Sequence, residues 1–323
     1  MDEFEMIERY FRPLTNGYGG CADLCDDAAV LDIPDGYEVV VTSDTLNEGV
    51  HFMRGEAPEN IACKALRVNL SDLASMGARP FSYQLNIAFP DKPIDEDWIS
   101  AFTGALAKDN AKFHVFCSGG DTTRIHADCL SISITAIGVV PKGQAVRRNG
   151  AKDGDVIIMT GPVGDAALGL KALQEGLDPK LYSNAITRHR VPVPRVGIEE
   201  VVRQYAHAAA DISDGLLADC MNIARASGLG VEIDMQKFEF SKDVQYGLQN
   251  NAISYEEILC GGDDYELILA VKESSVNVLL EELQENKLNQ LVVGCFVDSK
   301  VGFRVLNSGS HRIDFKSLGW KHF

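Results

Sequence analysis

Short acidic clusters stand beside apolar segments or glycine turns along this chain of 323 residues. A carboxylate beside an apolar core is costly unless something positive neutralises it, and most of the clusters have no Lys or Arg nearby. Mg²⁺ takes oxygen ligands and is usually held by a few carboxylates together with substrate phosphates. The pattern therefore predicts a fold that gathers carboxylates for metal-dependent phosphate chemistry. The clusters are Asp26-Asp27, Thr42-Ser43-Asp44, Asn69-Leu70-Ser71-Asp72, Gly119-Gly120-Asp121-Thr122, Asp211-Ile212-Ser213-Asp214 and Gly262-Asp263-Asp264.

Strand-like and helix-like segments alternate in both halves of the chain, which predicts an α/β or α+β fold. On the helix expected over 59–76, Asp72 shares an apolar stripe with Ile61, Ala65 and Val68, so this inward-facing carboxylate needs a partner. The expected strands are 28–31, 37–42, 113–117, 130–140, 156–160, 231–235, 265–271 and 291–297, and the expected helices are 3–11, 59–76, 95–111, 165–175, 213–226 and 274–286.

A segment rich in Pro, Gly and basic residues, 141–150, is the best candidate for a domain boundary. We therefore expect two domains, 1–142 and 143–323. Gly-Gly-Asp occurs at 119–121 and again at 261–263, which hints at related halves without establishing a duplication.

Composition excludes several classes of protein. The formal charge of −17 opposes general binding to nucleic acid or to anionic membranes. No apolar run approaches the ~20 residues of a membrane span, and no signal peptide is visible. The eight cysteines are scattered without a Cys-x-x-Cys pair, as in a reduced cytoplasmic protein. We expect a cytoplasmic protein that binds neither nucleic acid nor membrane.

Local motifs leave some alternatives open. A single Asp is usually a helix cap or turn residue, and Gly161-Pro-Val-Gly164 is either a phosphate cradle or a plain turn. Motifs of P-loop enzymes, protein kinases and calcium loops do not occur.

The ordered motifs resemble those of the thiamine-monophosphate kinase family, within the superfamily of ATP-using enzymes typified by aminoimidazole ribonucleotide synthetase. The resemblance covers nearly the whole chain. It rests on Cys25-Asp-Asp-Ala-Ala-Val30, Thr42-Ser-Asp-Thr-Leu46 with His51-Phe52, Lys64-Ala-Leu-Arg-Val-Asn-Leu-Ser-Asp-Leu-Ala-Ser-Met-Gly-Ala78, Gly119-Gly-Asp-Thr-Thr-Arg124, Asn149-Gly-Ala-Lys-Asp-Gly-Asp155, Asp211-Ile-Ser-Asp-Gly-Leu216, Gly261-Gly-Asp-Asp-Tyr-Glu-Leu267 and Gly319-Trp-Lys-His-Phe323.

The resemblance implies ATP-dependent phosphorylation of thiamine monophosphate to thiamine diphosphate with several Mg²⁺ ions. It also implies a two-domain aminoimidazole ribonucleotide synthetase-like fold with a cleft between the domains, and a homodimer formed through the N-terminal sheets. Carried over position by position, it assigns Asp27, Thr42, Ser43, Asp44, Asp72, Asp121, Asp211 and Asp214 to magnesium, with Asp44 and Asp121 central to catalysis; Gly120, Asp121, Arg148 and Ser213 to ATP; and His51, Asp263 and Trp320, or Phe315 in its place, to the substrate. Asp26 and Asp264 are then turn or supporting residues.

Physical chemistry is compatible with these roles. A substrate phosphate with a second pKa of about 6 is largely ionised at neutral pH, so no dedicated general base is needed. Arg148 can contact ATP phosphates through its guanidinium. An aromatic face such as that of Trp320 and a carboxylate such as Asp263 suit the cationic thiazolium of thiamine.

The chain departs from the family pattern at two positions. Cys25 stands where a glycine is usual, and Asp263 stands where Glu is common. Alternatives are another ATP-using member of the superfamily, a two-metal phosphate-ester hydrolase, and a non-catalytic nucleotide-binding homologue.

Overall fold

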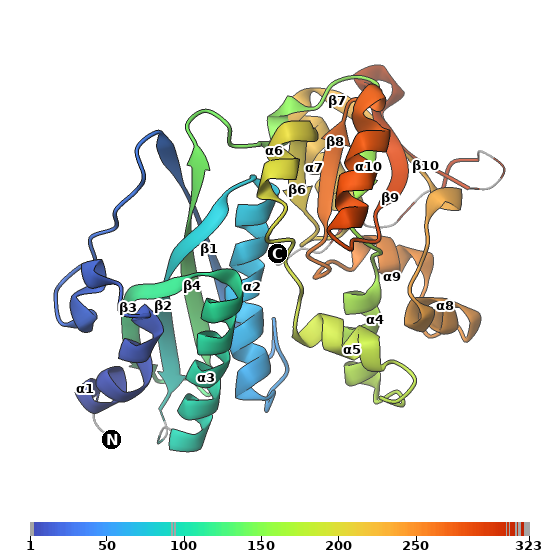
Figure 1. Ribbon diagram of the computed structural model, residues 1–323. Coiled ribbons are helices and arrows are strands. Elements are labelled where there is room, and N and C mark those ends of the chain that lie inside the picture. The colour runs from blue at the N-terminus through green and yellow to red at the C-terminus, as the bar shows by residue number, and fades with distance from the viewer. Residues whose placement is uncertain are drawn as a thin grey trace. The chain divides into compact units, whose positions relative to one another are not determined.

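The computed structural model describes residues 3–91, 93, 95–307, 309, 311–313, 315, 318 and 319. The chain divides into two compact units, which are described separately (Figure 1). Unit 1 comprises Met1–Leu73 and Ala78–Gly143, and unit 2 comprises Ala74–Gly77 and Gln144–Phe323. Within the described residues, no helix is long and apolar enough to cross a membrane.

Unit 1 is built on a four-stranded sheet in the order β1-β4-β2-β3. Strands β2 and β3 pair in parallel and the other neighbours are antiparallel, with Val41 of β1 opposite Ile137 of β4. The order places β1 at an edge of the sheet. The strands are β1 (Tyr37–Asn47), β2 (Arg79–Pro90), β3 (Phe116–Ile125) and β4 (Ser131–Pro141).

The long helices α2 (Pro58–Ser75) and α3 (Glu96–Phe113) accompany this sheet, after a short α1 (Glu3–Met6) (Figure 1). Alternate residues of β4, from Ile132 to Ala136, are buried. A buried ion pair between Arg67 and Asp109, with Nε–Oδ2 and Nη2–Oδ1 distances of 2.7 Å each, fastens α2 to α3. Both helices were expected from the sequence, and their bounds differ from the prediction by one or two residues.

Unit 2 contains a six-stranded sheet in the order β10-β7-β9-β5-β8-β6. Only β10 and β7 pair in parallel among these neighbours. The strands are β5 (Val156–Met159), β6 (Ala206–Asp211), β7 (Leu229–Asp234), β8 (Leu267–Val271), β9 (Leu291–Asp298) and β10 (Phe303–Leu306).

Two apolar clusters cover the two faces of this sheet. Ile157 of β5 and Ile268 of β8 pack with α4 and α7, whereas Ile158 and Leu269 pack with α6 and α10. A strand buried on both faces reads as a continuous apolar run, as Leu267–Val271 does. The helices are α4 (Asp165–Glu175), α5 (Ser183–Arg190), α6 (Glu199–Tyr205), α7 (Leu216–Ser227), α8 (Lys242–Gln249), α9 (Tyr255–Cys260) and α10 (Val276–Glu285).

The mixed α/β units confirm the predicted fold class, and three local expectations were wrong. Residues 28–31 form no strand, and Val30 is exposed. Strand β1 continues past Thr42 to Asn47, and β3 runs through Gly119–Asp121, where a loop was expected. Asp44 and Asp121 are therefore held within strands and not in loops beyond them.

Candidate active site

The first group of predicted metal residues lies where β1 meets α2 in unit 1. The hydroxyl of Thr42 donates a hydrogen bond to Asp72 Oδ2 at 2.5 Å. The backbone N–H of Asp44 donates to Asn69 Oδ1 at 3.1 Å. Side chains alternate along a strand, so Thr42 and Asp44 share one face. The inward-facing Asp72 thus has the polar partner that its position on an apolar stripe required.

Ser43 lies between them and points to the other face of β1. Its hydroxyl donates to the carbonyl of Ile134 at 3.2 Å and contacts Thr135 Oγ1 at 3.0 Å. The structure therefore does not bring the Ser43 hydroxyl together with Thr42, Asp44 and Asp72.

Asp44 has a perturbed acidity. Burial, the charge of Asp72 and a side-chain hydrogen bond with Asp72 raise the pKa of Asp44 to about 6. Two carboxyl groups this close resist simultaneous ionisation, and a bound divalent cation would relieve that repulsion. The oxygen-only donor set suits a hard cation such as Mg²⁺.

A second group lines a pocket of about 300 Å³ in unit 1, where Asp27, Gly120 and Asp121 are found together. Gly120 has no room for a side chain, because an added Cβ would lie 1.8 Å from the carbonyl oxygen of Leu85. Glycine at this position therefore lets β3 pack closely against β2 beside Asp121.

The backbone of the loop before Asp27 can accommodate Cys25, which stands where a glycine is usual in the family. Cys25 has φ −104°, a conformation open to any residue, so the replacement of glycine imposes no backbone strain there. Asp26 accepts a hydrogen bond from the backbone N–H of Asp27 at 2.9 Å, as a turn residue does.

His51 follows β1 in unit 1. Its Nδ1 accepts a hydrogen bond from the backbone N–H of Asn47 at 3.0 Å, and its carbonyl accepts one from Lys64 Nζ at 2.9 Å. The first bond fixes the tautomer, with the proton on Nε2 when the ring is neutral. The imidazole is therefore set as a donor at Nε2.

In unit 2, the predicted residue Asp211 ends β6, and Ser213 and Asp214 follow it before the start of α7. Asp219, on the first turns of α7, accepts hydrogen bonds from the backbone N–H groups of Ser213 at 3.2 Å and Asp214 at 3.1 Å. Burial, with a contribution from Asp214, raises the pKa of Asp219 to about 7. This carboxyl group fixes the shape of the loop.

Arg148, predicted to contact ATP, lies in a short 3-10 helix, Arg148–Gly150, close to α7. Its carbonyl accepts a hydrogen bond from the Ser227 hydroxyl at 3.0 Å, and its charge lowers the pKa of Asp219 against the effect of burial. The exposed guanidinium thus belongs to the same region of unit 2 as Ser213 and Asp214.

Asp263 joins this group through the backbone. Its N–H donates to the carbonyl of Ser213 at 2.9 Å, and its φ of 62° is left-handed. The hydroxyl of Tyr265 donates to Asp263 Oδ1 at 3.1 Å, and Nδ1 of the buried His189 lies 3.6 Å from Oδ2. The hydrogen bond from Tyr265 therefore orients the carboxylate, and the His189 ring lies near its other oxygen.

The neighbouring Asp264 has a different role. It is buried and accepts hydrogen bonds from the backbone N–H of Gly164, at 3.0 and 3.1 Å, and of Ala166, at 3.4 Å. These amides begin α4, so the Gly161–Gly164 turn is closed by a carboxylate of the protein. Of the two alternatives for Gly161–Gly164, the structure therefore favours the plain turn, because Asp264 already occupies the backbone amides that a phosphate would need.

Among the described residues, no three His, Cys, Asp or Glu side chains converge closely enough to hold a metal ion. Trp320 lies outside the described residues. Phe315, its alternative, packs on the apolar core of unit 2.

Comparison with known proteins places these features in a family. The AIR synthase related protein N-terminal domain model matches residues 25–140, and the corresponding C-terminal domain model matches residues 152–306. The chain is 38% identical over 323 residues to a thiamine-monophosphate kinase of Caulobacter vibrioides, covering 99% of this chain and 90% of that protein. The chain belongs to the thiamine-monophosphate kinase family.

Solved structures agree with that membership. A thiamine-monophosphate kinase crystal structure from Stenotrophomonas maltophilia is 36% identical, with a TM-score of 0.85, over 94% of this chain and 96% of that one. AaThiL complexed with AMPPCP and TMP is 27% identical, with a TM-score of 0.78, over 92% and 91% of the two chains. The aminoimidazole ribonucleotide synthetase-like fold expected from the motifs is confirmed.

Sequence reasoning overlooked two residues of this thiamine-monophosphate kinase family member. Asp219 holds the Ser213-Asp214 loop, and His189 contacts Asp263. Asp219 could have been identified from the sequence, since an acidic residue in the first turns of a helix often accepts hydrogen bonds from nearby backbone amides. His189 could not have been identified in this way, because its partner Asp263 is distant in the sequence.

Proposed function

We propose that this protein catalyses the ATP-dependent phosphorylation of thiamine monophosphate to thiamine diphosphate. The observation that carries the proposal is the similarity to AaThiL complexed with AMPPCP and TMP over 92% of this chain, which also carries the ordered acidic motifs. Both substrates are anions and the protein has a formal charge of −17, so metal ions suit their joint binding.

Several Mg²⁺ ions are part of the proposal, held by Asp27, Thr42, Ser43, Asp44, Asp72, Asp121, Asp211 and Asp214. The raised pKa of Asp44 beside Asp72 supports a cation there, because ionising both carboxyl groups is unfavourable without one. When bound, the metal supplies neutralisation of the phosphate charges. Ser43 fits this set through its backbone better than through its hydroxyl, which is engaged with β4.

ATP would be bound by Gly120, Asp121, Arg148 and Ser213. Gly120 lines the same pocket as Asp121, so its backbone lies beside the proposed phosphate position. The guanidinium of Arg148 offers the fork of N–H donors that suits phosphate oxygens. Asp219 would keep Ser213 in place for this contact.

Thiamine monophosphate would be bound by His51, Asp263 and Trp320. His51 is set to donate from Nε2, which suits a phosphate oxygen. The Asp263 carboxylate, oriented by Tyr265 and close to His189, suits the cationic thiazolium or the donor groups of the pyrimidine.

The proposed transfer needs no general base from the protein. The attacking atom is an oxygen of the substrate phosphate, which is largely ionised at neutral pH. The chain's own residues would bind and align the two phosphates for in-line attack. In this scheme, Asp44 contributes charge to the proposed metal site. Asp219 holds the loop that carries Ser213 and Asp214 in position.

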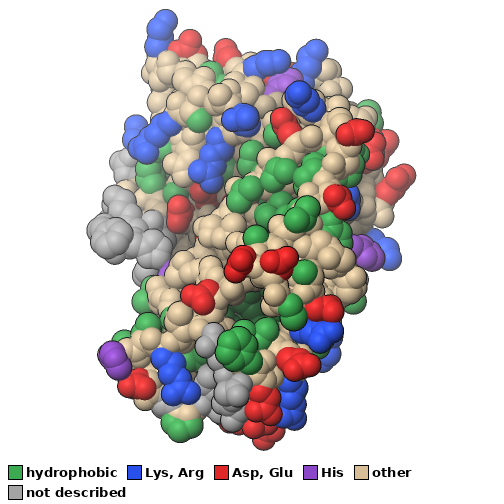
Figure 2. All heavy atoms as spheres, turned by 90° about the vertical axis from the view of Figure 1, so that its left-hand side faces the viewer, with side chains coloured by type: hydrophobic (Ala, Val, Ile, Leu, Met, Phe, Trp, Pro, Cys, Tyr) green, Lys and Arg blue, Asp and Glu red, His purple; other side chains and the backbone are tan. Residues whose placement is uncertain are grey.

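A homodimer formed through unit 1 completes the proposal. Tyr37, Val39 and Val41 of the edge strand β1 are 42%, 46% and 59% exposed and share one face. Figure 2 shows hydrophobic side chains gathered on the side of the protein that it presents. Exposed apolar patches on a soluble protein mark interaction surfaces. The predicted domain 1–142 would bind ATP and Mg²⁺ and form the dimer. The predicted domain 143–323 would supply the remaining residues of the active site.

We also propose a cytoplasmic location, on the basis of the cysteines. The eight cysteines, all within the described part of the chain, form no disulfide. This state suits a reducing compartment.

One assay separates this function from its alternatives. The protein is incubated with ATP, Mg²⁺ and thiamine monophosphate, and thiamine diphosphate and ADP are followed by chromatography. Equal amounts of the two products are expected. No thiamine diphosphate with intact ATP would refute the kinase, and ADP formed without thiamine monophosphate would favour a hydrolase.

A further inference from the structure

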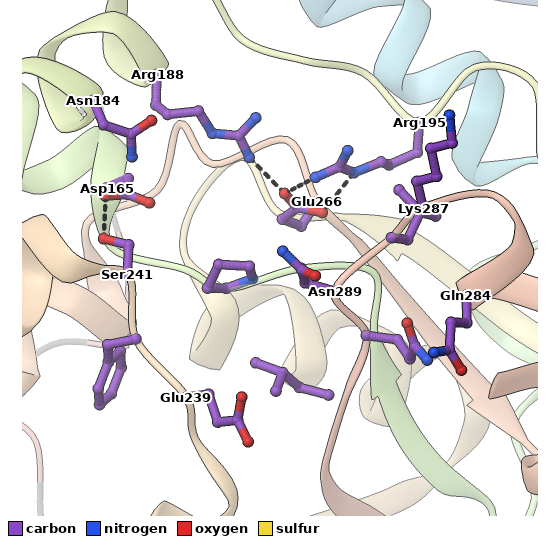
Figure 3. Close-up of a pocket in the computed structure, with 16 residues that line it drawn as sticks. Asp165, Asn184, Arg188, Arg195, Glu239, Ser241, Glu266, Gln284, Lys287 and Asn289 are labelled. Atoms are coloured by element: carbon purple, nitrogen blue, oxygen red, sulfur yellow. Dashed lines mark hydrogen bonds and ion pairs between the residues drawn. The ribbon is translucent and has the colours of Figure 1, made fainter. Parts of the chain in front are cut away.

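A cavity of about 760 Å³ opens in unit 2, near the point where the inner strand β5 ends and its neighbour β8 begins (Figure 3). We call it the arginine cavity, after Arg188 and Arg195 in its wall. Its volume is within the ~300–1,000 Å³ typical of small-molecule sites. None of the residues predicted for the active site lines it. It therefore needs an explanation of its own.

Both arginines converge on one buried carboxylate. Arg188 Nη2 donates to Glu266 Oε1 at 2.6 Å, and Arg195 Nε donates to Glu266 Oε2 at 2.6 Å, with a further bond from Arg195 Nη2 to Oε1. Glu266 is 0% exposed and also accepts from the Thr160 hydroxyl at 2.7 Å. The two guanidinium groups are thus held rigidly by a single negative charge.

The arginines retain unused donors. Their side chains are 19% and 14% exposed, and within the described part of the chain neither Nη1 atom makes a hydrogen bond. Each guanidinium has five N–H donors, so several remain for a ligand. Because Glu266 has already fixed both groups, binding costs little side-chain entropy.

Lys287 adds a third cation on the same side of the cavity. Figure 3 shows it beside Arg195, and its ammonium group forms no ion pair among the described residues. Glu266 pairs with both arginines, and the charge of Arg188 also acts on Asp165, so three cations face two carboxylates and exceed them by one charge. A compact dianion is the complementary ligand.

Acidic and polar side chains line the rest of the cavity, beginning beside Arg188: burial raises the pKa of Asp165 and the charge of Arg188 lowers it. Asp165 accepts a hydrogen bond from the Ser241 hydroxyl at 2.6 Å, and Glu239 lies farther round, away from the arginines in Figure 3. Phe240 supplies an apolar surface beside them. This wall suits hydroxyl or amino groups at the far end of a ligand.

We propose that the arginine cavity binds a small phosphorylated metabolite, with its phosphate on Arg188, Arg195 and Lys287 and its hydrogen-bond donors facing Asp165 and Glu239. The site is separate from the proposed kinase site and does not depend on that proposal. Its recognition rests on fixed guanidinium groups and not on metal ions.

Inorganic phosphate is the probe. The full chain is titrated calorimetrically at neutral pH in EDTA, without Mg²⁺ or ATP, so that metal-dependent phosphate binding does not contribute. We expect binding in the millimolar range. Lys287→Gln, at an exposed position, should weaken it about fivefold, and Arg188→Gln about tenfold or more, since each removes a charged donor. Lys272→Gln, an exposed control outside the cavity, should bind as the parent does.

Thermal unfolding of each variant checks the fold, because Arg188→Gln leaves Glu266 with Arg195 alone. Lys287→Gln touches no ion pair and keeps the test decisive if Arg188→Gln is unstable. No detectable binding by the parent up to about 50 mM phosphate would overturn the proposal. Unchanged affinity in folded Lys287→Gln would overturn it as well.

Discussion

The buried carboxyl group of Asp219 accepts a hydrogen bond from the backbone N–H of Asp214 at 3.1 Å. A second bond, from the N–H of Ser213, uses the same oxygen. The first turns of α7 therefore hold a loop in which both residues are assigned to ligands. The loop is shaped by a residue that touches neither ligand in the proposed scheme.

Asp219→Ala should weaken both stability and ATP use. Two backbone N–H groups lose their acceptor, which costs about 1–3 kcal/mol each when they stay buried. We expect a lower urea midpoint and a higher KM for ATP, with partial recovery in Asp219→Asn, which keeps an acceptor oxygen. Asp298→Ala, which removes an exposed cap on Lys300, is the matched control. Normal ATP kinetics in a destabilised Asp219→Ala would show that the loop holds its shape without this residue.

Asp44→Asn and Asp121→Asn should each lower kcat by about a hundredfold or more while the protein stays folded, since each removes a charge from the proposed metal set. Circular dichroism and steady-state kinetics at saturating Mg²⁺ check this. Asp35→Asn, at an exposed position in the same unit, should leave kcat unchanged. Near-normal turnover in either of the first two variants would remove that residue from the site.

Asp44 also predicts a pH dependence of stability in metal-free protein. Its pKa is about 6 in the folded state, against an ordinary value of 3.8. Between these values the folded state binds more protons, so this group's contribution to stability is fully present below about pH 4 and is lost as pH rises through 6. Urea unfolding in EDTA at pH 5 and pH 7 should show a smaller loss in Asp44→Asn than in the parent. Equal losses would place the raised pKa elsewhere.

Asp263→Ala should raise the KM for thiamine monophosphate about ten- to a hundredfold, because it removes the charged contact proposed for the substrate. The KM for ATP serves as the internal reference and should change little. A shift in both constants together would assign Asp263 to the loop that it shares with Ser213 and not to the substrate.

Val41→Glu should dissociate the proposed dimer. A charge in the middle of an apolar interface is left without a partner. Sedimentation velocity is expected to give a dimer for the parent and a monomer for the variant. Val278→Glu, at an exposed valine on α10 of unit 2, should remain dimeric. A dimeric Val41→Glu would move the interface away from this face of β1.

Much of the architecture and part of the site followed from local sequence pattern. The apolar stripe on α2 predicted an inward-facing Asp72, and the contact with Thr42 bears this out. Strand β6 was missed because Ala206–Asp211 is mostly alanine, which carries no β-branched or aromatic signal. Asp121 was expected in a loop because paired glycines usually mark turns, whereas here both lie in β3 and Gly120 lets that strand approach Leu85.

The short segment Gly261–Glu266 contains residues with two different roles, some structural and one not. Asp264 anchors the start of α4, and Glu266 gathers two arginines, so the protein depends on both for its integrity. Asp263 between them faces Tyr265 and His189 and anchors no helix. An exchange of Asp for Glu at 263 would therefore change the residue proposed to contact the substrate while the contacts of Asp264 and Glu266 stay intact. An engineer who seeks altered selectivity has the same freedom at that single position.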